Sequence, residues 1–330
     1  MAAGQRKVRV IALGGTIAMA ASSGALTPAL GAADLAAMTG PEGLLLEVDW
    51  TDFLGVPSAN ITFADLVRLA AVIEQLHGEG YHGVVVAQGT DSLEETAFAL
   101  DLLVTAPIDI VLTGAMRGSS AVGADGATNL LGALRFLEAS SGQGEVVIVM
   151  DDCVHAARLA VKGHTTALAA FTSGECGLRG RIHEGRFVAF NPARTGLPKI
   201  AADTGRTAPA VELVTIALEH SPWALRAPGH EAVEGWVIAA MGAGHVPETL
   251  VPDLERLART APVVLCSRTG AGPVCTATYG YPGAEIDLLG RGLLHGGSLS
   301  PLKARVLLTL LLMEGPDDCR ARFSRIAEAI

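Results

Sequence analysis

Residues 8–18 read VRVIALGGTIA, an apolar run that leads directly into two glycines and then a threonine. Glycine permits the tight turn that ends a buried strand, and it lets another group approach the backbone closely. A dinucleotide-binding loop would need the pattern GxGxxG, which this segment lacks. Two interpretations stay open from these residues alone. The segment is a plain structural turn, or it raises the Thr16 hydroxyl at a sheet edge as a nucleophile that needs a base.

Apolar runs and helical segments alternate through the first half of the chain. The runs cover residues 8–13, 44–48, 83–87, 108–113 and 146–150, and segments with helical spacing lie at 62–77, 93–104 and 129–137. This alternation predicts an α/β fold with a mainly parallel sheet, flanked by helices and joined by right-handed crossovers. In such sheets, ligands bind beyond the carboxyl ends of the strands.

The length of 330 residues predicts two domains, because a single core usually stops growing below this size. We expect a larger N-terminal domain over residues 1–192 and a smaller C-terminal α/β domain over 211–330. The linker between them, 193–210, has little periodicity and several Gly and Pro residues. The second domain is expected to have strands at 211–216, 235–241 and 263–266, and helices at 247–259, 301–314 and 317–330.

Composition excludes several classes of function. A net charge of −10 argues against a nucleic-acid partner, which would need clustered Lys and Arg. The apolar runs are too short to cross a bilayer, and the N-terminal run lacks a convincing cleavage site, so we expect a cytoplasmic protein with no membrane association. Five cysteines without a CxxC pair predict free thiols and neither a disulfide framework nor a metal site.

Two further segments carry reactive side chains. Residues 87–96, AQGTDSLEET, end a predicted strand and open a helix. Thr90 or Asp91 would cap that helix, or the pair would supply a hydroxyl and a carboxylate that binds an ammonium group. Residues 161–166, VKGHTT, place Lys162 among apolar and small residues. A solvated lysine is the ordinary interpretation, but an amine buried beside Thr90 would act as a base.

Taken together, these segments resemble the bacterial-type L-asparaginase family, which also includes glutaminase-asparaginases, over nearly the whole chain. The matching stretches are GGTIA at 14–18, GTDSLEET at 89–96, TGAMR at 113–117, DGATNL at 125–130, VKGHTT at 161–166 and GSLSPLKARVLL at 297–308. Each stretch alone is weak, but their order and their positions at strand ends make the set specific.

The resemblance implies a role for each matching residue. Thr16 would attack the amide carbon, while Thr90, activated by Lys162, forms a second hydroxyl–lysine triad with Asp91; which threonine attacks in which step stays open. Asp91 would also bind the α-ammonium group of the substrate, and Ser58 its α-carboxylate. The remaining predicted substrate contacts in this domain are Gly15, Gly89 and Ala115. Backbone N–H groups near the two threonines would stabilise the oxyanion. The resemblance implies no metal and no organic cofactor.

The resemblance also implies that the second domain of a neighbouring subunit completes the site, in a homodimer or homotetramer. Glu285 matches the ammonium-binding glutamate of the family, because it lies twelve residues before Gly297. His245 stands where many members carry asparagine. Its alternative interpretation is a loop histidine without a role.

Two departures from the family pattern concern the substrate. Many members have a tyrosine in a mobile lid after GGTIA, but the lid segment 19–30 has none and offers Ser22, Ser23 and Thr27 as hydroxyls. Ala59 stands where many members have glutamine. Both changes are expected to affect catalytic efficiency and selectivity for the substrate side chain. The predicted catalytic set itself is complete, since all four of its residues are present.

These residues favour hydrolysis of L-asparagine to L-aspartate and ammonia through an acyl-threonine, with minor glutaminase activity expected because one methylene is discriminated weakly. The alternative from another class is a non-catalytic amino-acid-binding protein on the same fold, which the missing lid tyrosine favours and the complete catalytic set disfavours. A tRNA-dependent amidotransferase subunit is disfavoured by the acidic composition and by the match beginning almost at residue 1.

Overall fold

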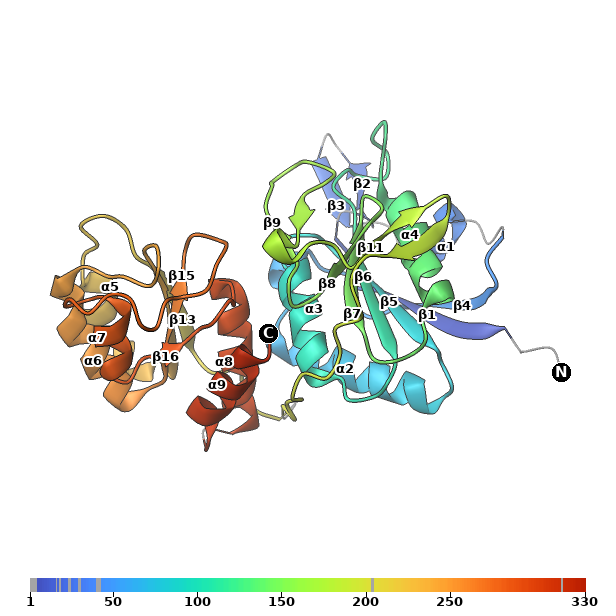
Figure 1. Ribbon diagram of the computed structural model, residues 1–330. Coiled ribbons are helices and arrows are strands. Elements are labelled where there is room, and N and C mark those ends of the chain that lie inside the picture. The colour runs from blue at the N-terminus through green and yellow to red at the C-terminus, as the bar shows by residue number, and fades with distance from the viewer. Residues whose placement is uncertain are drawn as a thin grey trace. The chain divides into compact units, whose positions relative to one another are not determined.

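The protein divides into two compact units, Met1–Lys199 and Ile200–Ile330, which we describe separately (Figure 1). The computed structural model describes residues 5–15, 17, 19–22, 25–28, 31–39, 43–202, 205–315 and 317–330. Thr16 and Ser23, which the sequence singled out, lie outside the described residues.

Unit 1 is built on an eight-stranded sheet with the order β12-β11-β8-β7-β6-β5-β1-β4. The five strands from β4 to β7 are parallel, and β8, β11 and β12 continue the sheet with antiparallel pairing. The bounds are β1 (Arg6–Ala12), β4 (Leu46–Asp52), β5 (Gly83–Ala87), β6 (Asp109–Thr113), β7 (Val146–Met150), β8 (Cys153–Ala156), β11 (Gly180–His183) and β12 (Arg186–Ala189). The predicted α/β class with a mainly parallel sheet is therefore confirmed.

The central strands match the sequence prediction closely, whereas the edge strand does not. β5 and β7 have the predicted bounds, because every residue in them is buried. β4 was expected at 44–48 but covers Leu46–Asp52. It is the edge strand and pairs only with β1, so its later residues are polar and partly exposed and give no apolar run.

Four helices flank the sheet: α1 (Ala32–Thr39), α2 (Phe63–Gly78), α3 (Leu93–Leu103) and α4 (Gly126–Ala139). α2 begins with a capping box in which the Thr62 hydroxyl accepts from the Asp65 N–H and the Asp65 side chain accepts from the Thr62 N–H. α2 packs against α3, and α1 packs against α4. The two pairs lie on opposite faces of the sheet (Figure 1).

The expectation of uniformly right-handed crossovers is wrong. The crossovers β5–α3–β6 and β6–α4–β7 step across the sheet in the same direction, yet α3 and α4 cover opposite faces. The crossover through α4 therefore has the opposite hand to the other three. Asn129 in α4 helps to hold this connection, since its amide nitrogen donates to the Gly114 carbonyl after β6 and its amide oxygen accepts from the Asp151 N–H after β7.

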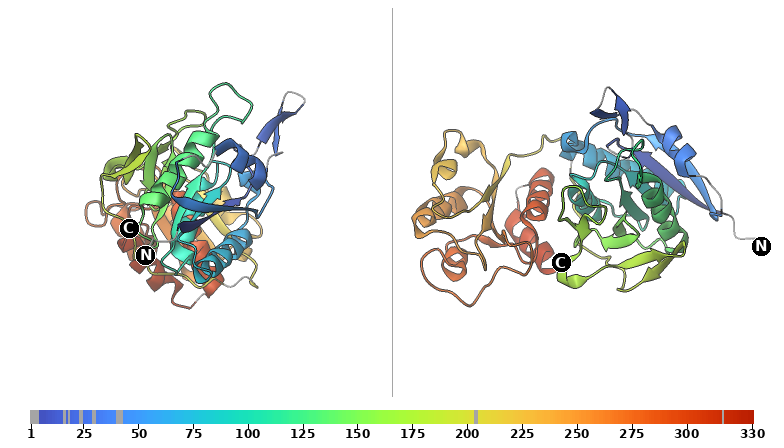
Figure 2. Two further views of the ribbon diagram at one scale, coloured as in Figure 1. Left: turned by 90° about the vertical axis from the view of Figure 1, so that its right-hand side faces the viewer. Right: turned by 90° about the horizontal axis from the view of Figure 1, so that it is seen from above.

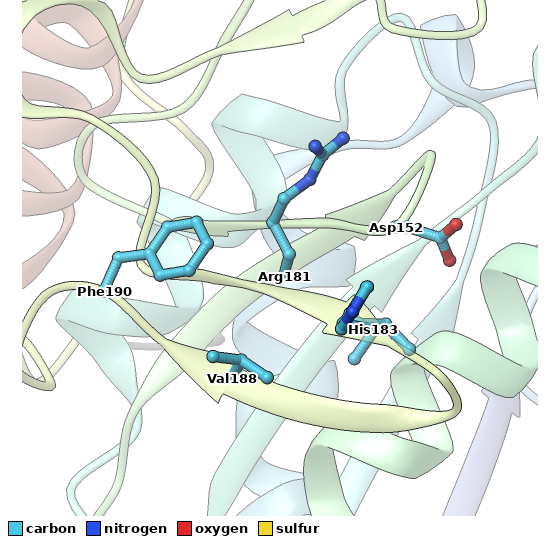
Figure 3. A pocket seen from close by; sticks show the side chains of 6 residues that line it. Asp152, Arg181, His183, Val188 and Phe190 are labelled. Atoms are coloured by element: carbon cyan, nitrogen blue, oxygen red, sulfur yellow. The ribbon is translucent and has the colours of Figure 1, made fainter.

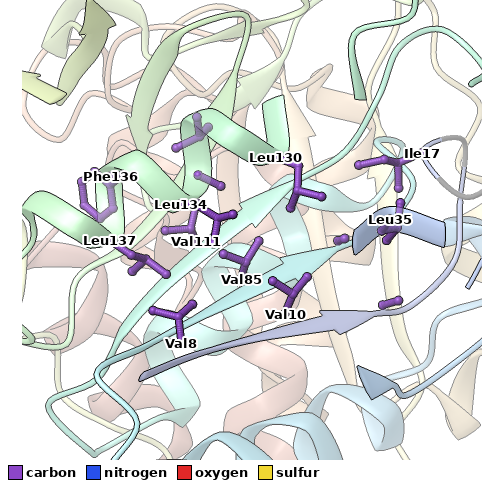
Figure 4. Close-up of a cluster of buried hydrophobic side chains, with 14 of the residues drawn as sticks. Val8, Val10, Ile17, Leu35, Val85, Val111, Leu130, Leu134, Phe136 and Leu137 are labelled. Carbon is purple, nitrogen blue, oxygen red and sulfur yellow. The ribbon is translucent and has the colours of Figure 1, made fainter. Parts of the chain in front are cut away.

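The core between α4 and the sheet is made of buried hydrophobic side chains, most of them aliphatic (Figure 4). Val85 and Val111 from the central strands meet Leu130, Leu134 and Leu137 from α4, and all five side chains are essentially without exposed surface. Burial of this kind stabilises the folded state by about 25 cal/mol for each Å² of apolar surface removed from water. The core thereby fixes the strands whose ends carry the candidate residues.

Several short hairpins, the β11–β12 hairpin among them, were not predicted from the sequence. β2 (Met19–Ser22) pairs with β3 (Ala25–Pro28) in a hairpin that projects from unit 1 (Figure 2), and it occupies most of the expected lid. β9 (Val161–Lys162) pairs with β10 (Phe171–Thr172) through two residue pairs only. β7 and β8 are joined through Asp151 and Asp152, both at positive φ. Strands this short leave no periodic pattern in the sequence.

Unit 2 has a four-stranded parallel sheet with the order β13-β14-β15-β16, and it confirms a second, smaller α/β body. The bounds are β13 (Val211–Thr215), β14 (Gly235–Ala240), β15 (Val263–Ser267), β16 (Leu294–His295), α5 (Trp223–Arg226), α6 (Val251–Thr260), α7 (Glu285–Gly290), α8 (Pro301–Glu314) and α9 (Cys319–Glu328). None of the described helices is both long and apolar enough to cross a membrane.

A buried histidine of unit 1 makes stability depend on pH. His155 in β8 is 2% exposed and hydrogen-bonds through Nδ1 to the Ser173 hydroxyl at 2.8 Å. Burial lowers the pKa of His155 from 6.5 to about 4. The unfolded chain thus takes up this proton below about pH 6.5 and the folded chain only below about pH 4.

We therefore expect the free energy of unfolding to fall between pH 6.5 and 4, with a contribution from His155 of up to about 3 kcal/mol. His155→Gln keeps a side chain that can hydrogen-bond to Ser173 but does not titrate, so it should flatten this part of the profile. Urea unfolding of both proteins at a series of pH values measures the difference. Identical pH profiles for the two proteins would contradict the assignment.

Candidate active site

Two glycine turns meet at the carboxyl ends of adjacent strands in unit 1. The chain leaves β1 toward β4 on one side, and it leaves β5 toward β6 on the other side, so the strand order reverses between β1 and β5. Such a switch point is where open α/β sheets bind ligands. Gly15 follows β1 with φ +85°, and a Cβ atom there would overlap the backbone N and Cα of Gly89, which follows β5. The two predicted substrate contacts Gly15 and Gly89 are therefore in direct backbone contact.

Ser58 lies beside this pair of turns. It begins a 3-10 helix, Ser58–Asn60, after β4, and it is 5% exposed. A Cβ atom at Gly89 would come within 2.7 Å of the Ser58 hydroxyl oxygen. The Ser92 hydroxyl donates to the Ser58 carbonyl at 2.8 Å and ties the two loops together. The structure thus brings Ser58 to the turns that the sequence assigned to the substrate.

Thr90, Asp91 and Lys162 form a hydrogen-bonded set. The Lys162 amine donates to the Thr90 hydroxyl at 2.9 Å and to the Asp91 carboxylate at 2.7 Å. The Lys162 side chain is 13% exposed, whereas the Asp91 side chain is 75% exposed, so the carboxylate is open to a ligand. The solvated interpretation of Lys162 is wrong, because the amine is held by both partners.

The helix-capping interpretation of Thr90 and Asp91 is also wrong. α3 begins after Ser92, and neither Thr90 nor Asp91 occupies the N-cap position. Glu94 in the first turn of α3 is buried and accepts the Lys162 backbone N–H at 3.3 Å. The segment 90–94, which leads into α3, therefore holds the lysine twice, through its backbone by Glu94 and through its amine by Thr90 and Asp91.

The loop after β6 closes the other side of Thr90. A Cβ atom at Gly114 would lie 2.5 Å from the Gln88 carbonyl oxygen and 3.1 Å from Cγ2 of Thr90. Ala115, a predicted substrate contact, follows and is 1% exposed. The Asp125 carboxylate fixes this loop by accepting the Met116 and Arg117 N–H groups at 2.9 Å each.

Sequence reasoning found the stretch DGATNL but gave no role to Asp125 or Asn129. The structure assigns both of them to positioning, because their side chains bind the backbone of residues 114–117 and each other at 2.9 Å. The available signal was the four-residue spacing of Asp125 and Asn129, which places an acid and an amide on the same side of the helix start.

Glu285 and His245 meet in unit 2. Glu285 begins α7 and has no exposed surface. Its Oε1 accepts the N–H groups of Thr278 and Tyr279 at 3.0 and 2.7 Å, and its Oε2 contacts Nε2 of His245 at 3.2 Å. Burial alone would raise the pKa of the Glu285 carboxyl, but these hydrogen bonds outweigh it and lower the pKa below the ordinary value. His245 is thus bound to Glu285 rather than free in its loop.

Sequence reasoning missed two tyrosines beside this pair. The Tyr281 hydroxyl lies 3.1 Å from Nδ1 of His245, and the ring of Tyr279 packs edge-on against His245 with centroids 4.8 Å apart. The two tyrosines stand four and six residues before Glu285, where the sequence TYGYPGAE gave a signal that was left without a role.

Unit 1 also has a cavity that is lined by other residues. It has a volume of about 360 Å³ and sits on the β11–β12 hairpin (Figure 3). Its lining residues are Asp152, Arg181, Ile182, His183, Val188 and Phe190. None of them is a predicted site residue, so we do not place the chemistry there.

Comparison with known proteins agrees with the geometry at the switch point. Residues 7–194 match the family model for the asparaginase N-terminal domain, and residues 210–322 match the glutaminase/asparaginase C-terminal domain. The chain belongs to the L-asparaginase and glutaminase-asparaginase family. This is a family of amidohydrolases, as the sequence resemblance predicted.

Individual relatives are similar over almost their full length. A probable L-asparaginase of Deinococcus radiodurans is 36% identical over 98% of this chain and 99% of its own, and an L-asparaginase of Bacillus licheniformis is 32% identical over 96% and 99%. The crystal structure of a probable cytoplasmic L-asparaginase from Campylobacter jejuni has a TM-score of 0.85 at 28% identity, covering 97% of this chain and 99% of that one. The family's two-domain pattern thus extends over the chain.

The contact between Gly15 and Gly89 yields a stability prediction. Gly15→Ala should destabilise the folded protein by more than the backbone strain of a positive φ alone, because the new Cβ would overlap the Gly89 backbone. Gly80 is the matched control: its φ of +87° is nearly the same as that of Gly15, but a Cβ there meets nothing within 4 Å. We expect Gly80→Ala to cost about 1–2 kcal/mol, and Gly15→Ala about 3 kcal/mol more. Urea unfolding measures both, and equal costs would contradict the contact.

Proposed function

We propose that the protein hydrolyses L-asparagine to L-aspartate and ammonia, with glutamine as a poorer substrate. The observation that carries this proposal is the contact of the Lys162 amine with both the Thr90 hydroxyl and the Asp91 carboxylate in a chain of the asparaginase family. A lysine in this geometry serves a hydroxyl as a base, which is the requirement of acyl transfer through threonine. No metal or organic cofactor enters the proposed reaction.

The proposed reaction has two steps. The Thr16 hydroxyl oxygen attacks the side-chain amide carbon, the carbon–nitrogen bond breaks, and the proton of the hydroxyl leaves with the amide nitrogen as ammonia. Water then attacks the acyl-threonine ester. Thr90 orients this water and accepts its proton while passing its own to the Lys162 amine, and Thr16 recovers a proton when the ester bond breaks. Backbone N–H groups at the two glycine turns bind the oxyanion in both steps.

Substrate recognition follows from charge and burial. The exposed Asp91 carboxylate suits the α-ammonium group of an amino acid, because Lys162 holds only one side of it. The buried hydroxyl of Ser58 next to Gly89 suits the α-carboxylate. Glutamine is longer than asparagine by one methylene group, and an enzyme pocket discriminates such a difference by only about 1–3 kcal/mol. This predicts slow turnover of glutamine.

We also propose that Glu285 and His245 serve the site of a neighbouring copy in a homodimer or homotetramer. Their support is the mutual contact in unit 2 and the position of Glu285 relative to Gly297. A cytoplasmic location is proposed as well, supported by the similarity to the Campylobacter jejuni protein described as a probable cytoplasmic L-asparaginase.

Ammonia release tests the reaction directly. The purified protein should release ammonia from L-asparagine and more slowly from L-glutamine, and Lys162→Met should lower kcat by about 10³-fold because Thr90 loses its base. Lys7→Met is the matched control, since Lys7 in β1 forms a half-exposed ion pair with Glu47 in β4.

Equal rates for Lys162→Met and Lys7→Met would exclude Lys162 from the reaction. If the unmodified protein releases no ammonia but melts at a higher temperature with L-asparagine present, the non-catalytic binding protein becomes the better description.

Mixing of two inactive variants tests the shared site. Thr16→Ala and Glu285→Ala should each be nearly inactive alone. Co-expressed and co-purified, they should regain up to about one quarter of the activity per site, because random pairing gives one intact combination in four. The measurement is the rate of ammonia release per subunit. Absence of any recovery, with mixed oligomers demonstrated by two affinity tags, would place Glu285 outside a neighbouring copy's site.

A further inference from the structure

A buried ion pair lies near the end of α3 that is farther from the candidate catalytic residues. Nε and Nη2 of Arg158 donate to the two carboxylate oxygens of Asp101 at 3.1 and 3.3 Å. The two side chains are only 5% and 2% exposed, so water competes little for these bonds. Both residues lie outside the stretches that the sequence analysis assigned to catalysis. A fork of two hydrogen bonds fixes the direction between its partners as well as their distance.

Asp101 and Glu94 lie on the same side of α3. They are seven residues apart, which is close to two helical turns and corresponds to about 10 Å along the axis. Glu94 accepts the Lys162 N–H at 3.3 Å, and Asp101 binds Arg158, which precedes Lys162 by four residues. One side of α3 therefore holds a single short stretch of chain, 158–162, at both of its ends.

The stretch between these two attachments has little slack. Four residues reach at most about 13 Å even when fully extended. The N–H groups of Leu159 and Ala160 both donate to the Ala156 carbonyl, which folds part of the connection into a turn. β9, which contains Lys162, pairs with β10 through two residue pairs only, and so small a hairpin cannot fix the lysine by itself. The attachments to α3 therefore determine where the amine lies relative to Thr90.

The last residues of unit 1 bind the same ion pair. Nη2 of Arg158 also donates to the Arg194 carbonyl at 2.8 Å, and the Lys199 amine donates to the backbone carbonyl of Asp101 at 2.7 Å. The pair thus joins three parts of unit 1, namely α3, the stretch 158–162 and residues 194–199. It is fixed from two sides and can serve as an anchor for the third.

A contribution to stability alone does not explain this pair. Taking two charges out of water costs about as much as their attraction returns, so hydrophobic residues of similar volume stabilise a protein as well or better. An arginine–carboxylate fork supplies one defined geometry, which a hydrophobic contact does not. The value of the pair therefore lies in what it positions.

We propose that Arg158 and Asp101 are positioning residues for Lys162. Together with Glu94, they keep the lysine amine at hydrogen-bond distance from the Thr90 hydroxyl. The catalytic consequence rests on the proposed asparaginase reaction, in which Lys162 serves Thr90 as a base. The positioning itself is a property of unit 1 that can be measured without any substrate.

The double variant Asp101→Leu/Arg158→Met tests the pair. It removes both charges together, because a single replacement would leave one charge buried alone and destabilise the fold for that reason. Glu145→Leu/Arg179→Met is the matched control. The Glu145 and Arg179 side chains form an ion pair in unit 1 that is 6% and 11% exposed, and Arg179 likewise donates to a backbone carbonyl, that of Asn191. The control thus removes a buried pair of the same type and keeps both attachments of the stretch 158–162.

Amine labelling reads the position of Lys162 without substrate. In the parent protein this side chain is 13% exposed and donates to two acceptors, so acetic anhydride should label it slowly relative to the half-exposed Lys7. Loss of the fork should raise the ratio of Lys162 to Lys7 labelling by about tenfold, because the amine then enters water more often. The control should change this ratio by less than about twofold. Mass spectrometry of the digested protein measures both lysines in one sample.

Steady-state kinetics test the catalytic consequence. We expect kcat for L-asparagine to fall by about 10- to 100-fold in Asp101→Leu/Arg158→Met, with KM within about threefold, because a small displacement of a base slows the chemical step. A merely structural role would lower activity equally in the two double variants and would leave the labelling ratio unchanged.

Arg158→Lys is a milder second variant that decides the question even if the double variant does not fold. It keeps both charges but replaces the fork by a single flexible amine. Labelling of Lys162 and kcat should therefore change in the same directions by a smaller factor, about threefold. Arg179→Lys is its matched control and should leave both quantities within about twofold of the parent.

The outcomes separate the positioning role from the function on which its consequence rests. Faster labelling of Lys162 with a parallel loss of kcat in the Arg158 variants supports the proposal. A labelling ratio that is equal in the Arg158 and Arg179 variants overturns it, and so does an unchanged kcat despite faster labelling. If the parent protein releases no ammonia, the proposed function is overturned, and labelling alone then supports or overturns the positioning of Lys162.

Discussion

The contact between the backbones of Gly15 and Gly89 is the constraint on which the candidate site depends. Neither side of this contact has room for a Cβ atom, so the turns after β1 and β5 approach more closely than side chains would permit. Ser58 and Thr90 are brought together by the same approach, because the Ser58 hydroxyl lies against Gly89 and Thr90 follows it directly. The strands below are fixed by a buried hydrophobic core, which gives the turns at their ends a rigid base.

Around this contact, charged and polar side chains fix the positions of loops and contribute little to the free energy of unfolding. Glu94 binds the backbone of Lys162, and Asp125 binds the backbone of residues 116 and 117. The Lys162–Asp91 pair is half open to water, where an ion pair contributes about 0–1 kcal/mol. Its importance lies in placing an amine beside a hydroxyl at hydrogen-bond distance. The reversed hand of the β6–α4–β7 crossover belongs to the same framework, since Asn129 connects the ends of both strands to α4.

Unit 2 shows the same principle with a different chain of groups. A carboxylate without exposed surface is kept ionised by backbone N–H groups, and its charge reaches the surface only through an imidazole and a phenol.

The sequence by itself determined the alternating architecture and the family, and it selected the candidate site residues, because buried parallel strands and strand-end motifs leave a local pattern. It located β5, β7 and α8 to the residue, and it selected Thr90, Asp91 and Lys162 from segments seventy residues apart. It did not reveal the antiparallel strands, the hand of the α4 crossover, or the polar edge strand β4, since pairing partners and faces are not encoded in short runs. Only the tertiary structure decided that Thr90 and Asp91 bind Lys162 rather than cap a helix, and that His245 joins Glu285 to Tyr281. These contacts link residues 36 to 72 positions apart, and in each unit their geometry is set by how that unit's own sheet brings separate loops together.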